Sequence, residues 1–329
     1  MSRIIIFKNK PKIISVATVC GKKEGAGNLG KYVDEIIVDD YCGEKSFEFA
    51  EREMLKKTII KIIDKANLTE QDIDVYIGGD LLDQIISSSF SAREFTFPFL
   101  GVYTACSTMG ESMLLGAILT DSGYLRNALC ATCSHFSTAE RQYRFPLEQG
   151  TTRPAQSQWT VTGAGGNLIS LAGEGVAITS ALIGRVVDYG VTDANNMGAA
   201  MAPAAADSLI DFFNSRGVEP DYYDLILTGD LGSLGSRILK DLIKMAGYNM
   251  DRNHLDCGEL IYNIMEDEYQ GGSGAGCSAV VFNSYIFQML KRGEYKRILF
   301  VPTGALLSTL STQQGESIPG IANVIELEA

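Results

Sequence analysis

The chain is poor in histidine, tryptophan, proline and basic residues. Its 329 residues include two histidines, one tryptophan and eight prolines, and 28 Lys and Arg stand against 40 Asp and Glu, for a net charge of −12. No run of Lys and Arg is available to neutralise a phosphate backbone, which argues against a nucleic-acid partner.

Long apolar runs are also absent. No stretch approaches the roughly 20 residues of a membrane-spanning helix, and residues 1–19 lack the apolar core and cleavage site of a signal peptide. Neither terminus carries a lipidation signal. Apolar residues make up 46% and charged residues 21%, values typical of a globular protein. We therefore expect a folded protein that is not secreted, and whose membrane association is peripheral.

Seven cysteines, an odd number, lie in apolar or strand-like segments. This pattern favours a reducing compartment and no disulfide framework. Cys130 and Cys133 form a CxxC pair, but Asn127–Cys133 is predicted to be a strand and no second pair lies nearby, so zinc or redox use is not expected. No acidic stretch has EF-hand spacing. The sequence predicts no resident metal and no cofactor.

The most informative stretch begins with a predicted buried strand at Phe99–Ala105. Ser107 or Thr108 can then cap a helix that continues to about Thr120. Because Glu111 is its one charged residue, the helix is apolar on nearly all sides and is expected inside the protein.

Cys106 lies at the turn between this strand and helix. The helix N-terminus directs unpaired N–H groups and the positive end of its dipole at the sulfur, which favours a thiolate and anions generally. The alternative is a buried, inert cysteine.

Two halves of the chain repeat one order of elements. Asp74–Leu81 and Asp224–Leu231 match at Asp, Gly, Asp and Leu with a constant offset of 150, and Ala105–Ser107 pairs with Gly276–Ser278. Each Cys-containing turn precedes an apolar helix and a further strand, which favours internal duplication and α/β layers. The predicted fold is α/β, with two duplicated halves, 1–180 and 181–329, packed in layers around a buried central helix pair.

Two flanking helices are predicted as well. Ser46 can cap a helix to about Ala66 with Leu55 and Ile59 on its apolar face, and a second helix is expected at Pro203–Ser215.

Four blocks of sequence carry a family resemblance. They are Tyr103–Glu111, Cys133–Phe136 with Ala139–Pro146, Arg153–Pro154 with Gln158–Gly165, and Tyr269–Cys277. They resemble the stage V sporulation protein AD family of spore-forming bacteria, within the thiolase and ketoacyl-synthase superfamily. The resemblance spans nearly the whole chain, and its most specific part, 141–165, is not shared by general thiolases.

The resemblance implies a thiolase-like fold and binding of pyridine-2,6-dicarboxylate (dipicolinate) or its calcium complex. It further implies a role in moving that compound into the developing spore, at the spore inner membrane, with other membrane-bound stage V A proteins as partners. Homodimer formation is an expectation from the superfamily.

Thiolase chemistry is not expected. A ketoacyl synthase also needs a His and an Asn that hydrogen-bond the thioester carbonyl. Comparison with the synthase pattern places Gly229 in the His position and Gly272 in the Asn position. Glycines there are expected to enlarge the cavity at the Cys106 helix. The alternative function is an acyltransferase or ketoacyl-synthase-like condensing enzyme that uses Cys106.

A flat dicarboxylate needs donors at both ends. Backbone N–H groups of the Cys106 turn and of the Gly271–Gly276 turn can hold one carboxylate. A guanidinium can clamp the other, and Trp159 can stack on the ring or serve as a core aromatic. The net charge would repel a free dianion, which favours local donors or a calcium-paired ligand. The predicted ligand-binding residues are Cys106, His135, Arg141, Arg144, Arg153, Trp159, Asp80, Asp230, Gly271, Gly272 and Ser273.

Four of the polar residues have open roles. His254 lies in a polar loop and is expected to be solvated, whereas His135 either faces the pocket or has a structural role. Asp80 and Asp230 end equivalent predicted strands. They form a carboxylate pair for acid–base work, or each caps the helix that follows.

Overall fold

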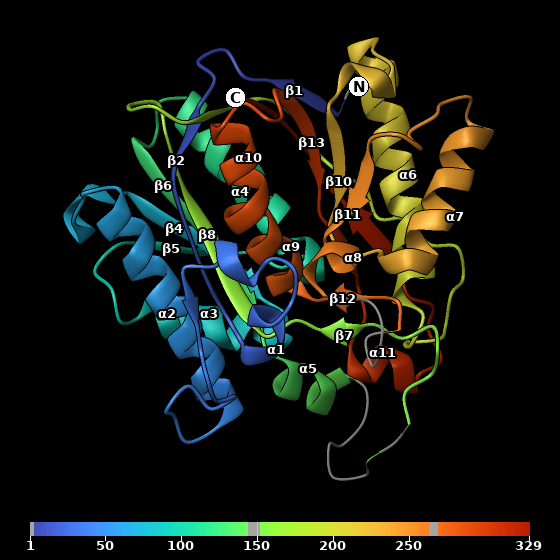
Figure 1. Cartoon of the computed structure of the whole chain (residues 1–329), viewed down its shortest axis with the longest axis horizontal. Coiled ribbons are helices and arrows are strands. Elements are labelled where there is room, and N and C mark those ends of the chain that lie inside the picture. The colour runs from blue at the N-terminus through green and yellow to red at the C-terminus, as the bar shows by residue number, and fades with distance from the viewer. Residues whose placement is uncertain (1–2, 144–149, 151, 263–268) are drawn as a thin grey trace.

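One mixed sheet runs through the whole molecule (Figure 1). The computed structural model describes residues 3–143, 150, 152–262 and 269–329. From one edge to the other the main strands are β11 (His254–Asp256), β10 (Leu225–Thr228), β13 (Arg297–Val301), β16 (Val324–Glu328), β9 (Val176–Leu182), β2 (Lys12–Cys20), β8 (Gly163–Ser170), β6 (Asn127–Ser134), β4 (Val75–Asp80) and β5 (Phe99–Gly101).

The sheet has the same pairing pattern on either side of its middle. β2 and β9 pair antiparallel at Lys12 and Ala177. Outward from this junction, each side has two antiparallel pairings followed by two parallel ones. The duplicated α/β fold predicted from the sequence is confirmed. The division into domains at residue 180, a position inside β9, stays a prediction.

The repeated aspartates perform the same task in both halves. Asp74 Oδ2 accepts the backbone N–H groups of Arg126 and Asn127 at 2.6 and 3.0 Å, where β6 begins. Asp224 Oδ2 accepts those of Lys296 and Arg297 at 2.7 and 3.0 Å, where β13 begins. Each aspartate thereby fixes the start of the strand that pairs beside its own.

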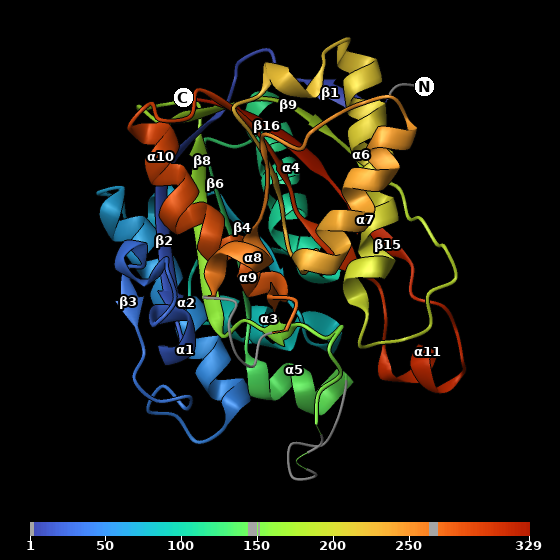
Figure 2. The same cartoon turned by 45° about the vertical axis from the view of Figure 1, so that its right-hand side comes forward.

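Helices cover both outer faces of the sheet and fill the space between its two halves (Figures 1 and 2). Three separate clusters of buried apolar side chains result, one inside and one on each outer side. The outer helices are α2 (Phe47–Lys65) and α3 (Ile86–Ala92) on one half, and α6 (Met197–Arg216) and α7 (Gly232–Met245) on the other. The inner helices are α4 (Thr108–Asp121) and α9 (Ala275–Val281), which continues through a π-turn at Phe282–Ile286 into α10 (Phe287–Lys291).

Strands buried on both faces alternate between two of these clusters. On β10, Leu225 and Leu227 pack in the inner cluster, and Ile226 between them packs against α6 and α7. On β4, Val75 and Ile77 face inward while Tyr76 joins the α2 side. This follows from the two-residue period of side chains along a strand.

The short elements lie around this frame. They are β1 (Ile4–Ile6), α1 (Lys22–Gly25), β3 (Glu35–Ile36), α5 (Phe136–Tyr143), β7 (Trp159–Thr160), α8 (Cys257–Ile261), β12 (Gly272–Ser273), β14 (Thr303–Ala305), α11 (Thr309–Gln313) and β15 (Gly320–Ala322). No described helix combines the length and the apolar character that crossing a bilayer requires.

The two predicted outer helices are present. The Ser46 hydroxyl accepts the N–H of Phe49, so the predicted cap of α2 is confirmed. The predicted start of α6 at Pro203 is wrong, because the helix begins at Met197 and holds Pro203 in its buried interior. Residues 197–202 are mostly Ala and Met, good helix formers that extend the helix before the proline.

The central stretch differs locally from its prediction. The strand is only β5, at the sheet edge, where Leu100 is 47% exposed, and is therefore shorter and less buried than predicted. A 3-10 turn at Ala105–Ser107 leads into α4, and neither predicted hydroxyl caps the helix. Ser107 donates to the carbonyl of Pro302 instead, and Thr108 to that of Ala105. The burial predicted for this helix is confirmed.

All seven cysteines are free, as predicted. Cys130 and Cys133 lie on β6, and their side chains pack into clusters on opposite faces of the sheet. A strand places residues three apart on opposite faces, so this CxxC pair does not form a joint site.

Candidate functional site

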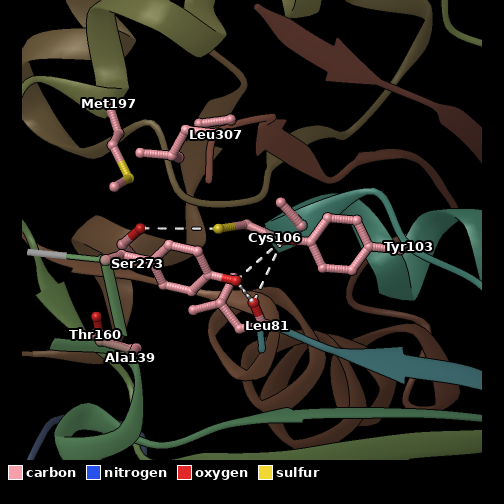
Figure 3. A pocket seen from close by; sticks show the side chains of 11 residues that line it. Leu81, Tyr103, Cys106, Ala139, Thr160, Met197, Ser273 and Leu307 are labelled. Carbon is pink, nitrogen blue, oxygen red and sulfur yellow. Dashed lines mark hydrogen bonds between the residues drawn. The ribbon is translucent and has the colours of Figure 1, made fainter. Parts of the chain in front are cut away.

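A pocket lies in front of Cys106, at the start of α4 (Figure 3). Its cavity volume is about 20 Å³, and the space between its atoms, counted out to the open mouth, is about 370 Å³. No lysine, arginine or histidine is among the described residues that line it. These residues are Leu81, Tyr103, Ala105, Cys106, Ala139, Tyr143, Thr160, Met197, Ser273, Ala305 and Leu307.

The Cys106 thiol is held in its neutral form. Its side chain is 3% exposed, and its Sγ lies 4.0 Å from Ser273 Oγ. Burial raises the thiol pKa well above its ordinary value, and the neighbouring charge of Asp230 raises it further. The expectation that the helix N-terminus favours a thiolate is therefore wrong, because desolvation and the carboxylate outweigh the helix dipole.

Asp230 lies behind the pocket floor and joins three segments. Its Oδ2 accepts the Ser273 hydroxyl at 2.9 Å and the Gly274 N–H at 3.0 Å, and its Oδ1 accepts the Thr303 hydroxyl at 2.9 Å. None of these donors belongs to α7, the helix that follows Asp230. Asp230 therefore does not cap that helix. Its contacts hold β12 and β14 at the pocket floor.

His254 was expected to be solvated, and this is wrong. The side chain is 7% exposed, and its Nε2 lies 2.9 Å from the Thr228 hydroxyl. That hydroxyl donates to Asp256 Oδ2 at 2.6 Å. Burial lowers the pKa of His254 to about 3, so the ring is neutral and serves as a structural donor at the end of β10.

The two glycines in the synthase positions do not open space. A Cβ on Gly229 would lie 2.7 Å from Thr303 N and 2.9 Å from Pro302 Cα. A Cβ on Gly272 would lie 2.7 Å from a side-chain carbon of Ile261. The predicted enlargement of the cavity is wrong, because backbone and apolar side chains from other segments fill both places.

In the glycine-rich turn at Gly271–Gly276, two backbone N–H groups are bonded to side chains of the protein. Gly274 donates to Asp230 and Gly276 donates to Ser134 Oγ at 3.0 Å. Gly271 has a φ of +109°, and its missing Cβ allows the backbone of Gly258 to approach. Two of the N–H groups expected to hold a ligand carboxylate are therefore already engaged.

Arg153 and Trp159 form a stacked cluster beside α5. The ring of Phe136 stacks on Trp159 at 3.9 Å, and the Lys23 ammonium lies 4.3 Å from the same indole. Arg153 pairs with Glu140 at 3.1 Å and donates to the carbonyl of Gln158. Neither Arg153 nor Trp159 is among the pocket-lining residues.

The other predicted cationic and histidine ligands lie elsewhere. Arg141 is exposed and pairs with Glu48 at 3.6 Å. His135 is buried away from the pocket lining, with Nε2 2.8 Å from the Asp40 carbonyl and Nδ1 accepting the N–H of Ser137. Its role in the structure is therefore that of a fixed neutral ring. Arg144 falls outside the described residues.

Asp80 fixes the turn that follows β4. Its two oxygens accept the N–H groups of Leu82 and Ser88, at 3.0 and 2.6 Å. Since Ser88 lies in the first turn of α3, this is the helix-capping role, and no contact joins Asp80 to Asp230 among the described interactions. Of the predicted ligand-binding residues, Cys106 and Ser273 line the pocket.

Sequence reasoning missed most of the pocket wall. Tyr103 and Tyr143 lie inside the resemblance blocks and could have been found there, whereas Met197, the first residue of α6, and Leu307, in a loop, belong to no motif. In Figure 3 both lie across the pocket from Leu81. Within the described part of the chain, no cluster of three or more His, Cys, Asp or Glu side chains offers a metal site.

Solved structures share this architecture over nearly the whole chain. One is 3-oxoacyl-[acyl-carrier-protein] synthase III from Aquifex aeolicus, with a TM-score of 0.55 and 14% identity over 97% of this chain and 100% of that chain. Another is OleA from Xanthomonas campestris with cerulenin, with a TM-score of 0.61 and 12% identity over 99% and 98%. These likenesses show that the chain has a thiolase-like fold.

Sequence similarity places the chain more narrowly. The family described as Stage V sporulation protein AD (SpoVAD) matches residues 1–328. The chain is also 44% identical to Stage V sporulation protein AD of Bacillus subtilis (strain 168), over 98% of this chain and 96% of that protein. It belongs to the Stage V sporulation protein AD family, as the resemblance predicted.

Proposed function

We propose that this protein is a non-catalytic thiolase-fold protein that binds dipicolinate in the Cys106 pocket and supports its uptake into the developing spore. The observation that carries the proposal is a pocket kept in front of a cysteine whose thiol is neutral. The lining is mainly apolar and aromatic, which suits the faces of a flat ring, and the cavity of about 20 Å³ must widen to admit one.

The absence of catalysis follows from the surroundings of Cys106. A condensing enzyme needs an activated thiolate and two donors for the thioester oxygen. Here Asp230 opposes ionisation of the thiol, and the Gly229 position is closed by the backbone of Pro302 and Thr303. We expect no acylation of Cys106 by acyl-CoA, measured by intact mass, and robust acylation would favour the acyltransferase alternative.

The charge of the ligand must be balanced before it enters. The pocket lining described above contains no cation, and Asp230 lies behind Cys106 and Ser273. A free dianion would lose its hydration and gain no ion pair, which is costly. We therefore propose that dipicolinate enters as its calcium complex, with the ring between Leu81 and Leu307.

Calorimetric titration tests this proposal. Dipicolinate is added with calcium chloride and, separately, with EDTA, and binding is expected to be at least tenfold tighter with calcium. Ala139→Leu fills the pocket wall, and Ala246→Leu places the same side chain on the surface as the control. Binding lost only in Ala139→Leu supports the site. Equal affinity in both folded variants places the ligand elsewhere.

Membrane association is proposed to be peripheral, through membrane-bound stage V A proteins at the spore inner membrane. The sporulation family and the lack of a spanning helix among the described residues support this. We expect the isolated protein, as a monomer or homodimer, to stay in the supernatant when protein-free lipid vesicles are sedimented. Tight binding to such vesicles would contradict it.

A further inference from the structure

One wall of the pocket consists of α5 and the turn that follows β4. Tyr143, near the end of α5, donates its hydroxyl to the carbonyl of Leu81 at 2.6 Å and lies 3.2 Å from Asp83 Oδ1. Tyr103 O–H lies 3.4 Å from both the Tyr143 oxygen and the Leu81 carbonyl. Both phenols line the pocket, so this contact closes the wall between α5 and the turn.

In this contact, the two phenol hydroxyl protons face three acceptor oxygens. Burial raises the pKa of Tyr103 to about 12 and raises that of Tyr143 further, so each phenol keeps its single proton. Leu81 O, Asp83 Oδ1 and Tyr143 Oη are three acceptors for these two protons. At least one acceptor receives no phenol proton at any time, and Tyr103 also lies within reach of the Leu81 carbonyl.

The turn itself is strained. Gln84 and Ile85 are consecutive residues with φ values of +62° and +49°. The left-handed region is unfavourable for a β-branched side chain, and such strain persists only where surrounding contacts impose it. Asp80 imposes it here, through its bonds to the N–H groups of Leu82 and Ser88.

A second buried carboxyl group bonds to α5 and lies near Asp80. Glu51 on α2 is 0% exposed, accepts the hydroxyl of Thr138 on α5 at 2.7 Å, and lies near Asp80. Burial raises the pKa of both acids, and the charge of Asp80 raises that of Glu51 further. Cys133 on β6 and Glu48 on α2 also face Glu51, and no ion pair joins either acid to a lysine or arginine among the described residues.

We propose that the contact between α5 and the turn at 81–88 is the gate of the Cys106 pocket. Tyr143 on Leu81 is its latch, and the charge state of the Glu51–Asp80 pair sets how firmly it is closed. With one of the two acids neutral, Thr138 and the turn are held together. With both charged, repulsion between two buried anions loosens α5 from the turn and admits solutes.

The gate depends on the proposed function only for the identity of the ligand that passes it. The test of the gate uses no ligand. Cys106 lies on the pocket floor, so the rate at which methyl methanethiosulfonate modifies it, followed by peptide mass spectrometry, measures opening. Tyr143→Phe is expected to raise that rate about threefold to tenfold, the range of one hydrogen bond. Tyr124→Phe, at a site 82% exposed, is the control and should leave the rate unchanged.

The charge state is tested by the pH profile of the same rate. Glu51→Gln keeps an acceptor for Thr138 and removes one charge, so its profile contains the ionisation of Cys106 but not that of the gate. The wild-type rate should rise about tenfold more steeply than that of Glu51→Gln between about pH 6 and about pH 9. If Glu51→Gln does not fold, Asp80→Asn replaces it in the same comparison of pH profiles. Parallel profiles, or an unchanged rate in folded Tyr143→Phe, would overturn the gate, whatever the titration with dipicolinate shows.

Discussion

Replacing Asp256 with asparagine should destabilise the protein, although burial of this carboxylate argues the other way. The side chain is 1% exposed, and burial raises its pKa to about 7. If burial dominated, a neutral amide of equal shape would be tolerated or preferred. Four donors oppose that outcome, and they belong to Thr228, Leu231, Gly232 and Gly258 at 2.6, 2.9, 2.9 and 3.0 Å.

Three of these donors are backbone N–H groups, which cannot become acceptors. The asparagine oxygen can serve Gly232 and Gly258, and its NH₂ group then faces the hydroxyl of Thr228 and the N–H of Leu231. Thr228 can turn to accept, provided that His254 Nε2 gives up its proton, but the Leu231 N–H is left unsatisfied in the interior. One orphaned donor costs about 1–3 kcal/mol, and weakening the remaining charge-assisted bonds adds a similar amount.

The expected loss is about 3 kcal/mol of unfolding free energy. For a chain of 329 residues this corresponds to a fall in Tm of about 4 °C. Urea unfolding and differential scanning calorimetry measure both quantities, with Asp251→Asn at an exposed site as the matched control. An Asp256→Asn protein as stable as that control would show that burial outweighs the donors, and the reasoning would be refuted.

Three further changes test the same physical terms. Gly229→Ala should cost about 1–3 kcal/mol in urea unfolding, since its Cβ meets the backbone at 2.7 Å; wild-type stability would show that the backbone there yields freely. Arg216→Met should cost about 3–5 kcal/mol, because it leaves the fully buried Glu326 without its 3.0 Å partner, and a midpoint within error of wild type would contradict this. The folded-state pKa of Glu51 is raised, so its contribution to stability is fully present below the ordinary value of 4.5 and is lost as the pH rises through the raised value. Glu51→Gln should therefore flatten the fall in Tm above about pH 5, and identical pH curves would count against it.

Much of the fold could be predicted because its evidence is local. The matched segments at Asp74 and Asp224 are short, yet each aspartate binds the start of the neighbouring strand, and that shared task explains the match. The apolar character of residues 108–121 likewise predicted a buried helix. The start of α6 was mispredicted because proline was taken as a helix start, whereas the helix tolerates Pro203 inside a buried turn.

The candidate site was harder to predict. Its wall is assembled from segments as far apart as Leu81 and Leu307, and apolar residues in loops carry no motif. Glu51 did leave a signal, because it precedes Leu55 and Ile59 by four and eight residues and so shares their apolar face. A charged residue on that face indicates a buried acid and a special role for it.

The amino-acid sequence by itself determined the duplication, the order of strands and helices and the place of Cys106 at a helix start, since these depend on periodicity and near neighbours. Only the tertiary structure decided the charge state of Cys106 and the size of the space around it. The thiol is neutral because Asp230 lies beside it, and the glycine at 229 leaves no cavity because Pro302 and Thr303 fill it. Desolvation and close approach are set by residues more than seventy positions away along the chain, so their effects appear only when distant segments are packed together.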